Sequence, residues 1–263
     1  MVFTGFSVKF PEYEVITPQT GQSFHVRSLT VQEEENLKGS LVTPAKITQH
    51  LNQCIFQSIV KKPDAIKDYE SFLKLTTLKD RDALLYGLYH ITYEEIRNYD
   101  VTCSSCSKSY PVTIAASNTF NMNPYPENNI LSKRIGVPLS ITKGVTAIIK
   151  QPSLADESIA IGTLSARPGT SIESITETLI IEKFEEDIIN DTNPRSFTDK
   201  HDIIDAYMSL PSKDKRLITS EYLKSFGKYA IDLKMKVFCQ HCGHEEVVNI
   251  DIVANFFRAL YAG

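Results

Sequence analysis

The stretch Tyr99-Asp-Val-Thr-Cys-Ser-Ser-Cys-Ser-Lys-Ser-Tyr-Pro-Val-Thr-Ile114 has a counterpart in Met235-Lys-Val-Phe-Cys-Gln-His-Cys-Gly-His-Glu-Glu-Val-Val-Asn-Ile250. Each stretch has the pattern of a strand, a Cys-x-x-Cys turn and a second strand. Aligned without a gap at an offset of 136 residues (239 − 103), the two share both cysteines and three aliphatic positions. We therefore predict two β-hairpins that are copies of one another.

Paired cysteines on two tight turns predict a metal site. The candidate ligands are Cys103, Cys106, Cys239 and Cys242. Four thiolates form the tetrahedral site that Zn²⁺ prefers, with Zn–S bonds of about 2.3 Å. A zinc ribbon separates its two pairs by about 15 to 20 residues, whereas 132 residues lie between these pairs (239 − 106 − 1). We expect a folded body between the hairpins and one structural zinc per chain that joins them.

A site closed by four sulfurs leaves no position for water or substrate, so it favours architecture over catalysis. The alternatives are thiol redox chemistry and two local disulfides. A redox Cys-x-x-Cys opens a helix, whereas each of these turns is followed by a β-rich run. His241 and His244 could replace a sulfur, but with four cysteines present we expect solvated turn residues. Cys54 lies on the apolar face of a predicted helix and is expected in the core.

The composition is that of a globular protein. The chain has 263 residues, of which 42% are hydrophobic, and this is enough for one large domain or two smaller ones. A formal net charge of −4 gives no excess of positive charge for a nucleic acid backbone. The first residues lack the pattern of a signal peptide, and no apolar run is long enough to cross a membrane. We expect a reducing cytosol, which favours metal over disulfide, and no membrane partner.

The chain before the first hairpin has the pattern of a β-hairpin followed by helices. Residues 13–29 predict the β-hairpin, and Thr30 with Glu33 predicts a capping box at the start of a helix. A second helix is expected from Thr43 and Pro44, and another from Thr77. The apolar stripes expected to face the core are Ile47, Leu51, Ile55 and Ile59, then Tyr69, Phe72 and Leu73, then Leu84, Leu88 and Ile91.

The same order of elements returns after a segment rich in asparagine and proline. A predicted hairpin turns at Lys143-Gly144, and Ser153 with Asp156 repeats the capping box. The two copies align at an offset of 123 residues (144 − 21). We divide the chain into an N-terminal extension at residues 1–12, a first repeat at 13–120, a linker at 121–136 and a second repeat at 137–263.

The predicted fold class is therefore α+β. Each half has a β-hairpin, helices and a Cys-x-x-Cys hairpin, and the two Cys-x-x-Cys hairpins share one structural zinc about a pseudo-twofold axis. If the metal is shared, its binding free energy, on the order of 10 kcal/mol, is also folding free energy.

No catalytic motif is present. The sequence lacks a P-loop, a Gly-x-Gly-x-x-Gly, a Gly-x-Ser-x-Gly and a His-Glu-x-x-His pattern. His201 and Asp202 are adjacent on a predicted helix, where neighbouring side chains point in different directions. A nucleic-acid-binding zinc module is a competing hypothesis, but Lys108 is the only cation from Val101 to Ile114. We expect no enzyme activity and no small-molecule substrate.

Several short motifs resemble the baseplate hub and hub-assembly proteins of T4-like contractile-tailed bacteriophages. They are residues 21–35, the Leu-Lys-Asp-Arg-Asp82-Ala-Leu-Leu helix, the two cysteine hairpins and Leu210-Pro-Ser-Lys-Asp214. The resemblance spans most of the chain. It implies a non-enzymatic protein of tail assembly that binds other hub or tail subunits, as a component or as an assembly chaperone.

The same resemblance implies a location in the host cytoplasm during assembly and in the virion tail baseplate if the protein is a component. A zinc-ribbon adaptor or a nucleic-acid-binding zinc module remains the alternative. At the C-terminus, Phe256-Phe257 with Leu260-Tyr261 is either an aromatic anchor for a neighbouring subunit or a helix docked on the core.

Overall fold

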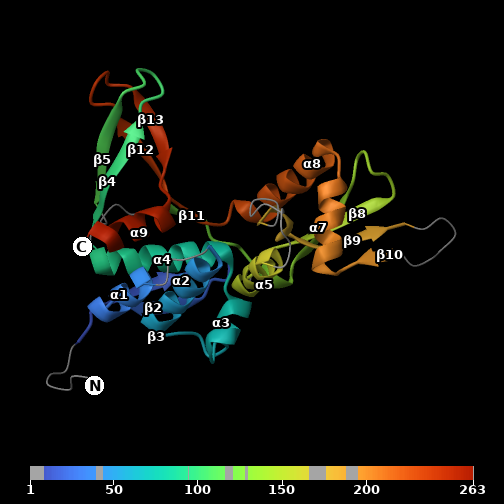
Figure 1. Cartoon of the computed structure of the whole chain (residues 1–263), viewed down its shortest axis with the longest axis horizontal. Coiled ribbons are helices and arrows are strands. Elements are labelled where there is room, and N and C mark those ends of the chain that lie inside the picture. Colours follow the sequence, from blue (N-terminus) through green and yellow to red (C-terminus); the bar gives the residue numbers. More distant parts are fainter. Residues whose placement is uncertain are drawn as a thin grey trace.

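A computed structural model gives the fold of the chain, which consists of two bodies and a projecting tower (Figure 1). The structure describes residues 9–39, 44–93, 95–115, 121–127, 130–165, 176–187 and 195–262. The first body has a three-stranded sheet and helices within residues 12–93, and the second has a four-stranded sheet and helices within residues 134–222. The tower consists of two hairpins, at residues 95–115 and 234–249. Mixed helix and sheet confirm the predicted α+β class.

An antiparallel sheet in the order β1-β2-β3 forms one side of the first body. Its strands are β1 (Glu12–Ile16), β2 (Ser23–Arg27) and β3 (Ile59–Lys61). Alternation along β2 points Phe24 and Val26 into the core, where both are fully buried. The predicted N-terminal hairpin is confirmed by the pairing of β1 with β2.

Four helices complete the first body: α1 (Val31–Gly39), α2 (Pro44–Ser58), α3 (Tyr69–Leu75) and α4 (Leu78–Tyr93). Helices α2 and α4 pack on this sheet, and α1 and α3 pack on α2. Leu51 and Ile55 of α2 and Leu84 and Leu88 of α4 are buried together in one core, as their helical spacing predicts. Cys54 is buried in the same core, as expected. The predicted cap at residue 43 lies outside the described residues.

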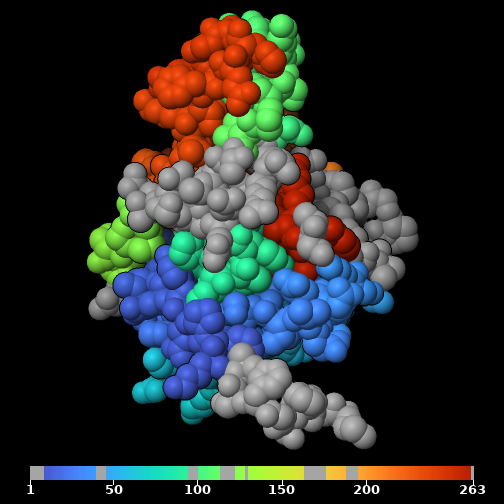
Figure 2. Space-filling view, turned by 90° about the vertical axis from the view of Figure 1, so that its left-hand side faces the viewer, coloured from blue at the N-terminus to red at the C-terminus, as the bar shows by residue number. Residues whose placement is uncertain are grey.

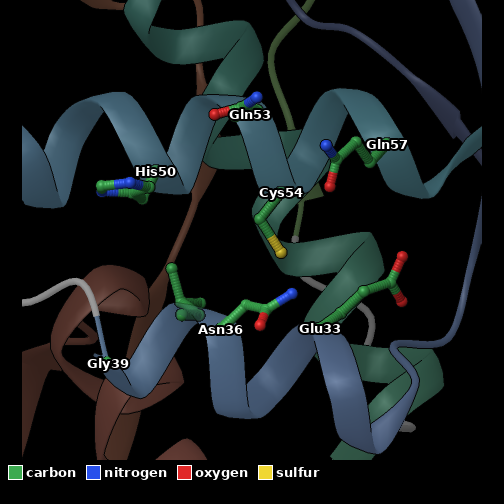
Figure 3. Close-up of a pocket in the computed structure, with 8 residues that line it drawn as sticks. Glu33, Asn36, Gly39, His50, Gln53, Cys54 and Gln57 are labelled. Atoms are coloured by element: carbon green, nitrogen blue, oxygen red, sulfur yellow. The ribbon is translucent and has the colours of Figure 1, made fainter.

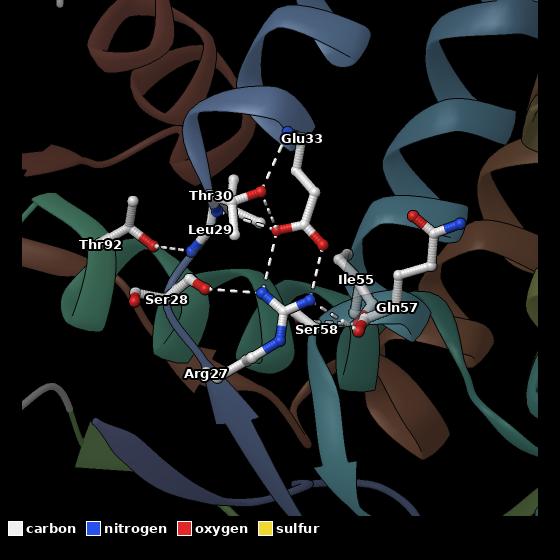
Figure 4. Close-up of polar contacts among 9 residues, drawn as sticks. All are labelled: Arg27, Ser28, Leu29, Thr30, Glu33, Ile55, Gln57, Ser58 and Thr92. Atoms are coloured by element: carbon white, nitrogen blue, oxygen red, sulfur yellow. Dashed lines mark hydrogen bonds and ion pairs between the residues drawn. The ribbon is translucent and has the colours of Figure 1, made fainter. Parts of the chain in front are cut away.

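The start of α1 is fixed by the predicted capping box (Figure 4). The backbone N–H of Thr30 donates to Glu33 Oε2 at 2.8 Å, and that of Glu33 donates to Thr30 Oγ1 at 3.2 Å. The Glu33 carboxylate also accepts hydrogen bonds from both terminal nitrogens of Arg27, at 2.9 and 2.6 Å. Partial burial opposes ionisation, but the hydrogen bonds from Arg27 and Thr30 lower the pKa of Glu33. One carboxylate thus joins the end of β2 to the first turn of α1.

The second body also contains an antiparallel sheet, which has four strands. Strands β7 (Arg134–Pro138), β8 (Val145–Lys150), β9 (Ile181–Glu186) and β10 (Arg195–Phe197) are antiparallel in the order β10-β9-β8-β7. The helices of this body are α5 (Leu154–Ser165), α7 (Lys200–Ser209) and α8 (Ser212–Tyr222). A π-helical turn, η2 (Leu223–Gly227), follows α8. Ile149, Phe184, Tyr207 and Ile218 are buried in its core. The predicted second capping box is confirmed, since the backbone N–H of Ser153 donates to Asp156 at 2.9 Å.

In both bodies the turn of the first hairpin is held by an aspartate at the start of a helix. Asp80 of α4 accepts the backbone N–H of Gln19 at 2.8 Å and the hydroxyl of Thr20 at 2.8 Å. Asp214 of α8 accepts hydrogen bonds from Ser140, Ile141 and Thr142, all between 2.8 and 2.9 Å. Both aspartates are fully buried. These carboxylates fix each hairpin on its helices.

The segment between the halves is tied to both bodies. Strand β6 (Asn121–Met122) pairs with β11 (Ile231–Asp232), and η1 (Ile130–Ser132) precedes β7. The backbone N–H of Tyr125 donates to the carbonyl of Pro18 at 2.7 Å, and its ring is buried in the core of the second body. This segment therefore connects the first hairpin turn to the second body.

The C-terminal helix α9 (Ile252–Ala262) returns to the first body, where it packs on α4 beneath the tower (Figure 1). Phe256 and Leu260 are buried in the first core, whereas Tyr261 is 57% exposed. Most of the proposed aromatic anchor is thus docked within the chain. Apolar residues alternate from 229 to 237, as is typical of one continuous strand. The structure divides this strand at Leu233, whose carbonyl accepts the N–H of Ile250.

The two bodies contact each other through α5. Arg81 of α4 forms an ion pair with Glu157 of α5 at 2.5 Å, and both side chains are largely buried. The backbone N–H of Leu154 donates to the carbonyl of Thr76 at 3.0 Å. Leu154 itself is buried in the core of the first body. The second body is therefore anchored on the first at the beginning of α5.

Candidate metal centre

The tower places two hairpins next to each other (Figures 1 and 2). One consists of β4 (Glu95–Thr102) and β5 (Ser109–Ala115), the other of β12 (Lys234–Phe238) and β13 (Glu245–Asn249). Val101 and Tyr110 of the first hairpin and Val237 of the second are buried in a small apolar cluster between them. The cluster holds the two Cys-x-x-Cys turns in a fixed relation.

The two turns have the same backbone structure. The carbonyl of Cys103 accepts the N–H of Ser107 at 2.9 Å, and that of Cys239 accepts the N–H of Gly243 at 2.8 Å. Ser107 and Gly243 both have left-handed backbones, with φ of 57° and 73°. Left-handed backbone costs about 1 to 2 kcal/mol for residues other than glycine, so Ser107 carries a strain that Gly243 avoids. Each turn directs its two cysteine side chains toward the other hairpin.

The structure brings the four predicted cysteines together. Their sulfur atoms all lie within 4.8 Å of one another. Sγ of Cys103 is 3.7 Å from Sγ of Cys242, and Sγ of Cys106 is 3.7 Å from Sγ of Cys239. Four sulfurs bound tetrahedrally at about 2.3 Å from one Zn²⁺ would be about 3.8 Å apart. Within the described part of the chain, no other group of three or more such side chains could hold an ion.

The cluster has a buried side and an open side. Cys103 and Cys239 are buried, Cys106 is half-buried and Cys242 is exposed. All four are free thiols, as is Cys54. Burial opposes ionisation of Cys239, but hydrogen bonds from the backbone N–H groups of His241 and Cys242 lower its pKa to about 7. Thiolates this close repel one another, so a bound cation is what would allow several to ionise together.

Polar contacts between the two turns surround the sulfurs. The hydroxyl of Tyr110 donates to Glu246 at 3.1 Å, and the backbone N–H of Ser104 lies 3.3 Å from the same carboxylate. His241 and His244 are exposed, as expected for turn residues. Each also contacts the opposite hairpin, His241 at the carbonyl of Ser109 and His244 at the hydroxyl of Ser104, both at 3.3 Å. Sequence spacing gave no signal for these cross-hairpin contacts.

A second candidate site is a cavity of about 400 Å³ between α1 and α2 (Figure 3). It is lined by Glu33, Asn36, Leu37, Gly39, His50, Gln53, Cys54 and Gln57. Burial raises the pKa of the Cys54 thiol to about 12, so it is neutral and a poor nucleophile at pH 7. Glu33 is engaged with Arg27, and His50 Nδ1 lies 2.7 Å from the carbonyl of Lys46. We assign no reaction to this cavity.

Comparison with known protein families identifies the chain. The model of the family described as T4 bacteriophage base plate protein matches residues 10–258, which is nearly the whole chain. The chain belongs to this family. The resemblance inferred from the short motifs is thereby confirmed at the level of a phage baseplate protein. Neither a search of curated proteins nor a search of solved structures gave a match.

A phage baseplate protein is part of the virion tail, and membership of the family suggests contact with other baseplate subunits. None of the helices in the described ranges is both long enough and apolar enough to cross a membrane.

Proposed function

We propose that this baseplate protein is a non-enzymatic hub component or hub-assembly factor that binds other baseplate subunits, with its two halves joined by one structural zinc. The family match over residues 10–258 carries the proposal. The closed four-sulfur geometry adds support, because it suits architecture and offers no open position for a substrate. Assembly in the host cytoplasm, with or without retention in the virion tail, follows from this role.

The proposed zinc ligands are Cys103, Cys106, Cys239 and Cys242, at one ion per chain. Two of the four cross-hairpin sulfur distances are 3.7 Å, and they support Zn²⁺ because they equal the spacing of a tetrahedral site to within about 0.1 Å. An ion shared in this way would fasten strands that are 132 residues apart in sequence (239 − 106 − 1). Its removal should therefore loosen the tower before either body unfolds.

We also propose that the chain is a tandem duplication, with repeats at residues 13–120 and 137–263 joined by the linker at 121–136. A β-bulge at the same place in both sheets supports the duplication more strongly than the similar order of helices and strands does. The β2–β3 pairing has a bulge between His25 and Val26, and the β8–β9 pairing has one between Ile148 and Ile149. These positions differ by 123 residues (148 − 25), which is the offset found in the sequence.

Equivalent ion pairs add support to the duplication. Arg27 and Glu33 correspond to Lys150 and Asp156, again at an offset of 123 (150 − 27 and 156 − 33). The nitrogen-to-oxygen distance is 2.6 Å in both pairs. The offset grows to 131 at the helix caps Asp68 and Asp199 (199 − 68). Most of the extra length of the second repeat therefore precedes α7, where β10 has no counterpart in the first body.

The proposal is tested by binding. Each of the other baseplate subunits encoded by the same phage is purified and titrated against the intact zinc-loaded chain. We expect saturable binding to at least one of them. Binding to none of them contradicts the proposed function. Mass spectrometry of purified virions then separates the two roles, because a component is retained in the particle and an assembly chaperone is absent from it.

A further inference from the structure

The outer face of the β12–β13 hairpin carries large apolar side chains exposed to solvent. Phe238 is 64% exposed and Val247 is 57% exposed. Because side chains alternate along a strand, Val237 and Val248 point toward the sulfur cluster while Phe238 and Val247 point away from it. Val247 pairs with Lys236, two residues from Phe238, so the two apolar side chains lie on one face.

The corresponding face of the other hairpin is an internal control. The offset of 136 matches Phe238 with Thr102 and Val247 with Pro111 (238 − 136 and 247 − 136). Both counterparts are exposed as well. The two hairpins have the same fold and the same relation to the sulfurs, so the structure of the tower requires neither a phenylalanine nor a valine at these positions. The aromatic side chain on one face alone needs another reason.

Charge on this face indicates the kind of partner. Lys234 and Lys236 are exposed beside Phe238, and Glu245 is the only carboxylate among the outward-facing residues of the two strands. Lys236 pairs with Glu245 at 2.9 Å, so the outward-facing side chains of the two strands carry a net charge of +1 (2 − 1), located at Lys234. Two copies packed face to face would bring these lysines together. A partner with carboxylates around an apolar pocket complements the face better.

The size of the face also argues against a simple dimer. Two five-residue strands, each about 17 Å long and about 5 Å wide, present roughly 170 Å², whereas a stable complex buries about 800 Å² on each partner. The face is therefore the size of an anchor within a larger contact. An exposed aromatic side chain on a rigid support is typical of the few residues that dominate such contacts.

We propose that the outer face of β12–β13 docks another protein subunit, which receives Phe238 in an apolar pocket and places carboxylates opposite Lys234 and Lys236. This inference rests on the proposed function, because it assumes that the chain binds other baseplate subunits. It goes further by naming the surface and the chemistry of the partner. The tower projects above the first body, so this face can be reached without rearrangement of the fold (Figures 1 and 2).

The test uses the full chain loaded with zinc and each purified baseplate subunit of the same phage as the probe. Affinities are measured by biolayer interferometry for wild type, Phe238→Thr and the matched control Thr102→Val. Phe238→Thr places on this hairpin the residue found at the equivalent position of the other. We expect it to weaken binding of one subunit at least ~10-fold, as for an interface anchor. Thr102→Val should stay within about twofold, because it alters the opposite hairpin.

Metal content and circular dichroism verify that both variants are folded. If wild type binds a subunit and Phe238→Thr binds it with the same affinity, the docking face is wrong and the proposed function stands. If wild type binds no subunit, the proposed function fails and the docking face fails with it. Self-association of wild type that Phe238→Thr abolishes would make the occupant a second copy. Binding of a 30-base-pair DNA probe that Phe238→Thr abolishes would make it nucleic acid, and either result overturns the proposal.

Discussion

Replacing Asp214 by asparagine removes one oxygen and the charge of a buried carboxylate while keeping its shape. Oδ1 accepts the backbone N–H and hydroxyl of Ser140 and the N–H of Ile141, and Oδ2 accepts the N–H and hydroxyl of Thr142. An asparagine in the same place turns an N–H₂ group toward one set of these donors. A hydroxyl can rotate to accept, but a backbone N–H cannot, so at least one buried donor loses its partner.

The expected loss follows from these contacts. A buried donor without a partner costs about 1 to 3 kcal/mol, and hydrogen bonds to a charged acceptor are worth about 1 kcal/mol more than those to a neutral one. The free energy of unfolding should fall by about 3 to 5 kcal/mol. With a urea m value of about 3 kcal/mol per M, the midpoint should move down by about 1 to 1.7 M.

Urea denaturation followed by circular dichroism measures this shift. Asp202→Asn is the matched control, because Asp202 also lies in the first turn of a helix but is exposed. Its midpoint should change little. If Asp214→Asn shifts the midpoint no more than this control does, the carboxylate does not hold the hairpin turn and the reasoning is refuted.

The acid side of the stability curve gives an independent check. Burial alone would raise the pKa of Asp214, but hydrogen bonds from Ile141, Thr142 and Ser140 hold it well below the usual 3.8. A lowered pKa in the folded state means that the stabilisation is complete above pH 3.8 and is lost as the pH falls below it. For Asp80 burial prevails and raises the pKa, so its ionised form weakens the folded state as the pH rises. Asp80→Asn should therefore cost less than Asp214→Asn at pH 7.

Four further substitutions test three separate parts of the structure. Gly243→Ala forces a side chain onto a backbone with φ of 73° and should lower the unfolding free energy of the zinc-loaded tower by about 1 kcal/mol. Ser107→Gly should raise the same free energy slightly, because it removes a side chain from a left-handed backbone. Chelator titration monitors both variants. Glu33→Gln should lower the free energy of unfolding by about 1 kcal/mol at pH 7. The decrease should become smaller as the pH falls below 4.5, because the pKa of Glu33 is lowered in the folded state. An equal decrease at pH 3 and pH 7 would contradict the ion pair with Arg27. Gly87→Ala places a methyl group against Val15 and should cost about 1 to 3 kcal/mol in urea denaturation; an unchanged midpoint would refute that close packing.

Local features of the fold were predictable from sequence. Thr30 with Glu33 and Ser153 with Asp156 have the spacing of capping boxes, and the structure has a helix at both places. The paired cysteines identified the hairpins because the spacing of a metal-ligating turn is set by the backbone of the turn itself. These signals succeed because each depends on neighbouring residues only.

Contacts between distant segments were not predictable. The apolar stripe of α9 predicts that the helix packs on a core. The sequence around Phe256 does not indicate whether that core belongs to the first body, where the residue lies, or to the second. Asp80 and Asp214 look like ordinary acidic residues near a helix N-terminus, where a negative charge is favourable in any case. Their role as acceptors for a hairpin turn depends on how the sheet lies on the helix. The break at Leu233 also arises from tertiary structure, since β11 pairs with β6.

In our proposal one zinc ion joins the two halves through both hairpins. This is tested by measuring the metal content of wild type, Cys103→Ser and Cys239→Ser by mass spectrometry. We expect one zinc per wild-type chain and its loss from either variant, because each removes one of four ligands from a shared site. Absence of zinc from wild type, or retention of a full equivalent when one hairpin is altered, would contradict the shared site.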